Sequence, residues 1–152
     1  MSKTLVAYFS ASGVTAEKAK ALAAAVGADI YEIKPQIPYS AADIKWTHPL
    51  ARCNKEWIKK TKPALADTNA NVEAYDTIFL AFPIWYYTAP LMIKSFLAAY
   101  DFSGKKIVVF ATSGGSDYKK AIVHIKEAVP SAEVVEGEML NGVDSFEKWI
   151  DA

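Results

Sequence analysis

The chain has 152 residues, of which 52% are hydrophobic and 12% aromatic, and this composition excludes a largely disordered protein. Its 17 basic and 17 acidic residues balance to zero net charge, which argues against a dedicated nucleic-acid-binding protein, because such proteins need a cationic excess. Cys53 is the only cysteine, so an internal disulfide and a cysteine-based metal cluster are excluded.

The first third of the chain predicts two strands around a helix. The run from Leu5 to Phe9 is apolar and indicates a buried strand. Apolar residues then recur at helical spacing up to Gly27, a residue type that commonly ends helices. Residues 29–33 alternate in polarity, which predicts a second strand at an edge of the sheet.

The segment from Lys34 to Tyr75 is broken up by prolines, and we expect a long loop with one helix at 52–60. Residues 34–62 contain seven basic and two acidic residues, so this is the most basic part of the chain.

The second half again alternates strand and helix patterns. Thr77–Phe82 is apolar on both faces, which predicts a central strand of a parallel sheet. The further expected strands are 107–111 and 134–140, and the expected helices begin at Pro90 and cover 119–128 and 146–150. This order predicts a doubly wound parallel α/β fold, with residues 1–152 in a single domain.

In open parallel sheets, ligands bind at the carboxyl ends of the strands, so the loops after the first, third and fourth strands are the candidate site. The first loop, residues 10–15, offers the hydroxyls of Ser10, Ser12 and Thr15 and the flexible Gly13 at a helix N-terminus. Such a loop suits a phosphate held by neutral donors. The phosphate-binding pattern GxxxxGK[ST] is absent, and a simple capped turn explains the loop equally well.

The second loop, residues 83–90, places Trp85, Tyr86 and Tyr87 in succession between two prolines. A rigid aromatic loop suits the stacking of a planar ring, although the same side chains could simply fill the core. The third loop, residues 112–118, contains Gly114 and Gly115, which expose backbone N–H groups. A plain flexible connector is the alternative for this loop.

These loops resemble those of the flavodoxin family, and the resemblance covers nearly the whole chain. Residues 10–15 resemble the family's loop for the phosphate of flavin mononucleotide (FMN), Ser/Thr-x-Thr/Ser-Gly-Asn-Thr, with Val14 where Asn is usual. Residues 83–90 and 111–116 together resemble a short-chain flavodoxin-like subgroup found mainly in bacteria.

The resemblance implies a five-stranded parallel sheet in the order 2-1-3-4-5 with helices on both faces. It also implies non-covalently bound FMN, with Trp85 or Tyr86 stacking on its ring, and no catalytic side chain and no metal. The phosphate would lie on Ser10, Ser12, Gly13, Val14 and Thr15. The ring would lie between Pro83, Ile84, Trp85 and Tyr86 on one side and Thr112, Ser113, Gly114, Gly115 and Ser116 on the other.

Three functions stay open at this point. The first is electron transfer to a redox partner protein. The second is an NAD(P)H-dependent oxidoreductase acting on a quinone-like acceptor, with Trp46, His48 and Arg52 lining the acceptor site and nearby lysines attracting the nucleotide phosphate. The third is a flavin-free binding module on the same scaffold. For all three we expect a cytoplasmic protein that binds neither nucleic acid nor membrane.

Overall fold

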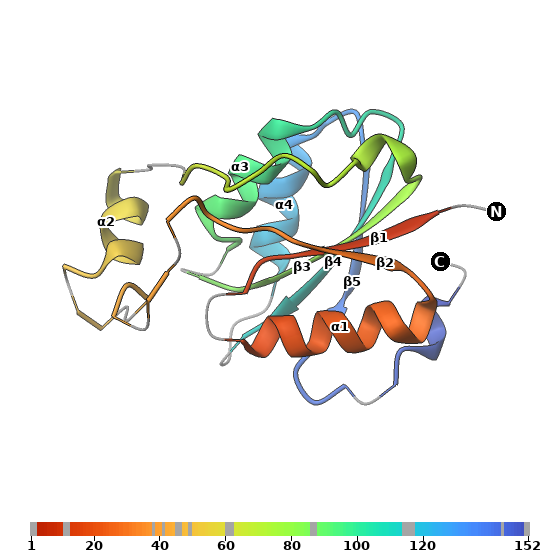
Figure 1. The fold of residues 1–152 in the computed structure, drawn as a ribbon, viewed down its shortest axis with the longest axis horizontal. Helices are drawn as coiled ribbons and strands as arrows, with labels where there is room; N and C mark the ends of the chain where they lie inside the picture. The colour runs from red at the N-terminus through yellow and green to blue at the C-terminus, as the bar shows by residue number, and fades with distance from the viewer. Residues whose placement is uncertain are drawn as a thin grey trace.

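The computed structural model describes residues 3–10, 13–37, 39–40, 42–44, 47–48, 50–59, 63–85, 88–113, 118–143 and 145–150. Within these residues, parallel strands form one sheet in the order β2-β1-β3-β4-β5, as predicted (Figure 1). The strands are β1 (Thr4–Tyr8), β2 (Asp29–Glu32), β3 (Thr77–Pro83), β4 (Lys106–Thr112) and β5 (Glu133–Met139). The helices are α1 (Val14–Val26), α2 (Arg52–Lys59), α3 (Leu91–Ala99) and α4 (Lys119–Ala128).

Most predicted elements are confirmed to within one residue at each end, but the expected final helix at 146–150 is wrong. The chain forms there only a single 3-10 turn, η2 (Glu147–Trp149). The ring of Trp149 packs edge-on against Phe110, with 5.0 Å between the ring centroids, so this turn is held by tertiary packing. A second 3-10 turn, η1 (Val72–Ala74), precedes β3 and was not predicted.

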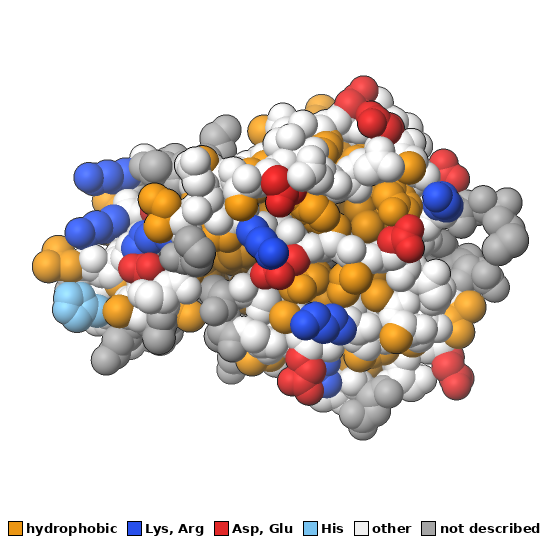
Figure 2. Space-filling view, in the orientation of Figure 1, with side chains coloured by type: hydrophobic (Ala, Val, Ile, Leu, Met, Phe, Trp, Pro, Cys, Tyr) orange, Lys and Arg blue, Asp and Glu red, His pale blue; other side chains and the backbone are white. Residues whose placement is uncertain are grey.

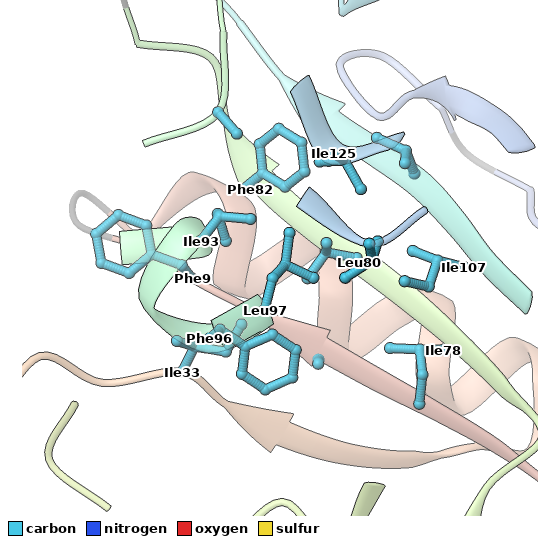
Figure 3. Packing of buried hydrophobic residues seen from close by; sticks show 14 of the residues in the cluster. Phe9, Ile33, Ile78, Leu80, Phe82, Ile93, Phe96, Leu97, Ile107 and Ile125 are labelled. Atoms are coloured by element: carbon cyan, nitrogen blue, oxygen red, sulfur yellow. The ribbon is translucent and has the colours of Figure 1, made fainter. Parts of the chain in front are cut away.

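Helices cover both faces of the sheet. Figure 1 shows α1 on one face, and α3 and α4 on the other. On the α1 face, Phe79 and Phe110 pack with Leu22 of α1. On the opposite face the side chains of α3 and α4 cover the alternate residues of the strands, and Figure 3 shows Phe82 among them. This alternation follows from the two-residue period of a strand.

Because all strands are parallel, their carboxyl ends meet at one edge of the sheet, and α2 lies beyond that edge (Figure 1). After β2, residues 34–66 leave the body of the protein and return to it, and α2 lies within this segment, which we call the excursion. Two backbone hydrogen bonds close its base, from Gln36 N to Ala64 O (2.7 Å) and from Ala66 N to Lys34 O (2.8 Å). The excursion is therefore anchored at its base, and α2 is placed next to the loops of the candidate site.

No helix in the described part of the chain has both the length and the hydropathy that a membrane span requires.

Candidate functional site

The turn between β1 and α1 presents an open helix N-terminus. The residue at the N-cap position of α1 is Gly13, which has no side chain to cap the helix and adopts φ +95°. Its N–H donates to Ser10 Oγ at 3.1 Å, and apart from its chain neighbours no described residue has an atom within 4 Å of the position that a Cβ would take. The partial positive charge of a helix N-terminus together with this open space suits an anion such as phosphate.

Two buried threonine hydroxyls join the first loop to the end of β4. Thr15 Oγ1 lies 2.7 Å from Thr112 Oγ1, and both residues are almost fully buried. This hydrogen bond uses only one of the two hydroxyl protons, so the second proton can still be donated to another acceptor. Val14, between Gly13 and Thr15, is half exposed.

The loop after β3 is tied to the end of β4 in the same region. Ile84 N donates to Thr112 O at 2.8 Å. Trp85 and Thr88 then exchange backbone hydrogen bonds of 2.8 and 3.0 Å, which hold these two residues side by side. The Thr88 hydroxyl lies 2.7 Å from His124 Nδ1 of α4, so this loop is also linked to the helix that follows the third loop.

Trp85 belongs to a cluster of three aromatic rings. Its ring meets Phe9 and Tyr39 edge-on, with centroid distances of 5.6 and 5.5 Å, and it is half buried. Phe9 and Tyr39 also line a hollow of about 340 Å³, which reaches Ser10 of the first loop. Trp85 is thus partly a packing residue, as the alternative for this loop expected, while one side of its cluster borders open space.

The excursion contributes Tyr39 through a network with α2. The Tyr39 hydroxyl donates to Glu56 Oε1 at 2.5 Å, and Arg52 Nε donates to Glu56 Oε2 at 3.1 Å. The Arg52 guanidinium lies 4.0 Å from the centroid of the Tyr39 ring and donates from Nη1 to Ile37 O at 2.6 Å. Burial of Tyr39, with its hydrogen bond to Glu56, raises the pKa of its hydroxyl well above the ordinary value.

Two of the residues expected to line an acceptor site, Arg52 and His48, interact with other parts of the protein. Arg52 is engaged in fixing α2 to Tyr39, and His48 Nδ1 accepts a hydrogen bond from Leu50 N (3.2 Å) at the start of α2. Both side chains therefore have structural partners. Trp46, which was expected beside them, lies outside the described residues.

The third loop begins with a side-chain anchor that sequence reasoning missed. Ser113 N donates to Asn141 Oδ1 at 2.8 Å, and Asn141 comes from the turn after β5. Tyr39, Glu56 and His124 were also missed as parts of the site, because their partners are far away along the chain. The predicted residues Ser12, Tyr86, Gly114, Gly115 and Ser116 lie outside the described residues.

The described residues fit a cofactor that has a phosphate at one end and a planar ring at the other. The uncapped N-terminus at Gly13 and the Ser10 hydroxyl suit the phosphate, and Trp85 offers a half-buried aromatic surface. In the described part of the chain, no group of three or more His, Cys, Asp or Glu residues could hold a metal ion.

The chain is similar to proteins of one known family. The model of a family described as flavodoxin matches residues 3–152, whereas no curated protein matches the chain. A protein of Bacteroides eggerthii inferred to be a flavoprotein is 41% identical, with a TM-score of 0.91 over 99% of this chain and 94% of its own. A second one, from Bacteroides uniformis, is 40% identical, with a TM-score of 0.92 over 99% of both chains.

A flavoprotein of Lactobacillus acidophilus, solved in complex with FMN, is 21% identical to this chain. Its TM-score is 0.75 over 93% of this chain and 95% of its own, a likeness of fold.

Proposed function

The chain belongs to the flavodoxin family, and on this premise we propose that it binds FMN non-covalently and passes electrons through it to a redox partner. The observation that supports this best is the convergence of the three loops. Thr112 contacts Thr15 of the first loop through its hydroxyl (2.7 Å) and Ile84 of the second through its carbonyl (2.8 Å).

We assign the phosphate to the first loop. Backbone N–H groups at the start of α1, with the hydroxyls of Ser10, Ser12 and Thr15, neutralise it without a cationic side chain. Gly13 lets the backbone approach closely, since no Cβ stands in the open space beside it. Val14 contributes its backbone only.

We assign the ring to the space between the second and third loops. Trp85 and Tyr86 offer the stacking surface and exclude water, and Pro83 and Ile84 fix the start of their loop. The residues that would hold the other side of the ring are Thr112, Ser113, Gly114, Gly115 and Ser116. FMN, when bound, supplies redox chemistry in steps of one or two electrons, and the protein orients and tunes it.

A second candidate function is an NAD(P)H-dependent reductase of a small quinone-like acceptor. The hollow of about 340 Å³ beside Phe9 and Tyr39 would admit such a molecule. We favour electron transfer over the reductase because the side chains considered for an acceptor site are engaged elsewhere. Arg52 donates to Glu56, and His48 accepts a hydrogen bond from Leu50 N.

The visible absorption spectrum of the purified protein, after FMN is added and unbound FMN is removed by gel filtration, tests the proposal. We expect flavin bands that dithionite bleaches under anaerobic conditions and that NADPH leaves unchanged. Bleaching by NADPH would identify the reductase instead. Absence of bound flavin would contradict both and leave a flavin-free binding module.

Substitution of Trp85 tests the assigned ring site. Trp85→Ala should weaken FMN binding about fivefold, because a stacking surface is worth on the order of 1 kcal/mol. The control is Tyr75→Ala, since Tyr75 precedes β3 and lies at the opposite edge of the sheet. Titration of FMN fluorescence measures both, and equal affinities for Trp85→Ala and the unmodified protein would place the ring elsewhere.

A further inference from the structure

The most exposed large apolar side chains in the described part of the chain lie in the excursion. Among the described residues, the three most exposed large hydrophobic side chains are Ile58, Leu50 and Ile37, at 76%, 68% and 67%. The next, Val123, is exposed to 52%. Ile58 lies on α2, and Leu50 lies in the turn two residues before that helix begins.

The same excursion separates the charges of the molecule. Residues 34–62 hold seven of the 17 basic and two of the 17 acidic residues, which leaves ten basic and fifteen acidic residues elsewhere. A chain without net charge therefore has a segment of charge +5 and a remainder of charge −5. Figure 2 shows basic, histidine and hydrophobic side chains together at the end of the molecule where α2 lies.

The two faces of α2 differ in chemistry. Cys53 is buried, and Glu56, the only acidic residue of the helix, points inward to Tyr39 and Arg52. Lys55 and Lys59 are exposed and lie four residues apart, so they share a side of the helix next to Ile58. The outward face is thus apolar at Ile58 with positive charges beside it.

This face also lies close to the proposed redox site. Trp57 of α2 and Trp85 of the second loop line the same small hollow, together with Tyr39. Only the thickness of one helix therefore separates the outward face of α2 from the loop that we assign to the flavin ring.

We propose that the outward face of α2, formed by Lys55, Ile58 and Lys59, together with the exposed Leu50 just before the helix, is the docking surface for an acidic redox-partner protein; this inference rests on the proposed function. An apolar centre flanked by charges of one sign suits a transient complex, since the charges steer the partner and the apolar contact excludes water. The negative remainder of the molecule repels an acidic partner from other faces, which restricts docking to this one.

The experiment compares two redox proteins of opposite charge. The FMN-loaded protein is mixed in stopped flow with a reduced, acidic plant-type ferredoxin, and separately the dithionite-reduced protein is mixed with oxidised, basic cytochrome c. Each ferredoxin gives up one electron, so two are needed to reduce one FMN, with protons taken from water. We expect the ferredoxin to react faster at low ionic strength and to lose about tenfold or more in rate as salt is raised.

Charge reversal locates the surface. Lys55→Glu with Lys59→Glu should slow the reaction with ferredoxin about tenfold at low salt. The matched control, Lys20→Glu with Lys126→Glu on α1 and α4, makes the same change in net charge and should alter the rate by less than about twofold. Leu50→Ser with Ile58→Ser should slow the reaction at high salt as well, because it removes apolar contact.

The outcomes separate this inference from the proposed function. The flavin spectrum and dithionite reduction of each variant report on FMN binding alone. If the protein binds no flavin, an NMR titration of the flavin-free protein with oxidised ferredoxin still tests docking, and signals of residues 50–59 should shift. A ferredoxin rate that does not fall as salt is raised, equal effects of the two charge reversals, or no shifts at 50–59 would overturn the inference. So would loss of binding to phosphatidylserine vesicles in Lys55→Glu/Lys59→Glu with an unchanged ferredoxin rate, which would indicate a membrane surface.

Discussion

At the scale of single residues, the candidate site depends on a few polar contacts between segments far apart in sequence. Thr15 and Thr112 are 97 residues apart, yet their hydroxyls form a buried hydrogen bond of 2.7 Å. Removing one partner leaves the other hydroxyl buried without a hydrogen bond, which costs more than the bond itself is worth.

Valine at these two positions tests the pair. Thr15→Val and Thr112→Val should each lower the free energy of unfolding by about 1–3 kcal/mol, and the double variant should lose less than the sum of the two. Urea unfolding of all four proteins completes the cycle. Strict additivity would show that the two hydroxyls do not depend on each other.

Gly137 is a second residue whose identity is set by its surroundings. A Cβ at this position would stand 2.4 Å from Val109 O and 3.0 Å from the Phe110 ring, where the register between β4 and β5 shifts. Backbone cannot move aside as a flexible side chain can. Gly137→Ala should therefore destabilise the fold by about 2–3 kcal/mol.

Urea unfolding measures this effect, with Glu136→Ala on the same strand as the control. A stability of Gly137→Ala equal to that of Glu136→Ala would mean that the sheet opens at this position without cost.

At the scale of elements, α2 is unusual because a side-chain network attaches it to the body of the protein. It has eight residues, too few for a stable isolated helix. Its attachment comes from Cys53, which is buried, and from Glu56 and Arg52, which meet Tyr39. Tyr39 is in turn packed against Phe9 and Trp85. The network thus couples the position of α2 to the aromatic cluster of the candidate site.

The raised pKa of Tyr39 gives this attachment a pH dependence. Since the folded-state pKa lies above the unfolded value of about 10, the contribution is complete below about pH 10 and is lost as pH rises further. Tyr39→Phe should cost about 1–2 kcal/mol at neutral pH and lose less stability than the unmodified protein above about pH 10.

Urea unfolding between about pH 8 and 11 checks this prediction, and amide hydrogen exchange of α2 reports whether the loss is local. The hydrogen bond to Asp29 raises the pKa of Tyr75 as well, so Tyr75→Phe is the control for the exchange measurement only and should leave the amides of α2 unchanged. Parallel decline of stability in Tyr39→Phe and the unmodified protein would contradict it.

At the scale of the whole molecule, stability is distributed unevenly between the sheet and the excursion. β3 is buried along almost its whole length, and β1 and β4 flank it on either side. Among the described residues of the excursion between Gln36 and Ala64, the large apolar side chains of Ile37, Leu50 and Ile58 are exposed instead. Segments with few buried contacts open more readily than the core does.

Native-state hydrogen exchange should therefore show two classes of amide. Those of β1, β3 and β4 should exchange only through global unfolding, whereas those of α2 should exchange through a local opening of lower free energy. NMR measurement at increasing urea concentration distinguishes the two. Protection of residues 52–59 equal to that of β3 would show that α2 unfolds with the sheet.

Much of this fold could be predicted from the sequence. The apolar runs at 5–9, 77–82 and 107–111 and the helical spacing between them are local patterns, and a parallel sheet is the arrangement that buries such runs on both faces. Even the meeting of the three loops follows from parallel topology, because the strand ends must share one edge.

The predicted helix at 146–150 is wrong because this prediction, too, used only a local pattern. A short apolar run has too few residues for its period to distinguish a helix from a single turn, and the packing of Trp149 against Phe110 decided for the turn.

The hydrogen bonds that hold the site together are visible only in the folded structure. The contacts of Thr15 with Thr112, Thr88 with His124, Ser113 with Asn141 and Tyr39 with Glu56 follow no spacing rule. A hydrophobic pattern recurs every few residues along the chain, so the helices, the strands and their order along the chain could be predicted from it. A polar contact between distant segments has no period, and it exists only once the folded backbone brings both groups within hydrogen-bond distance.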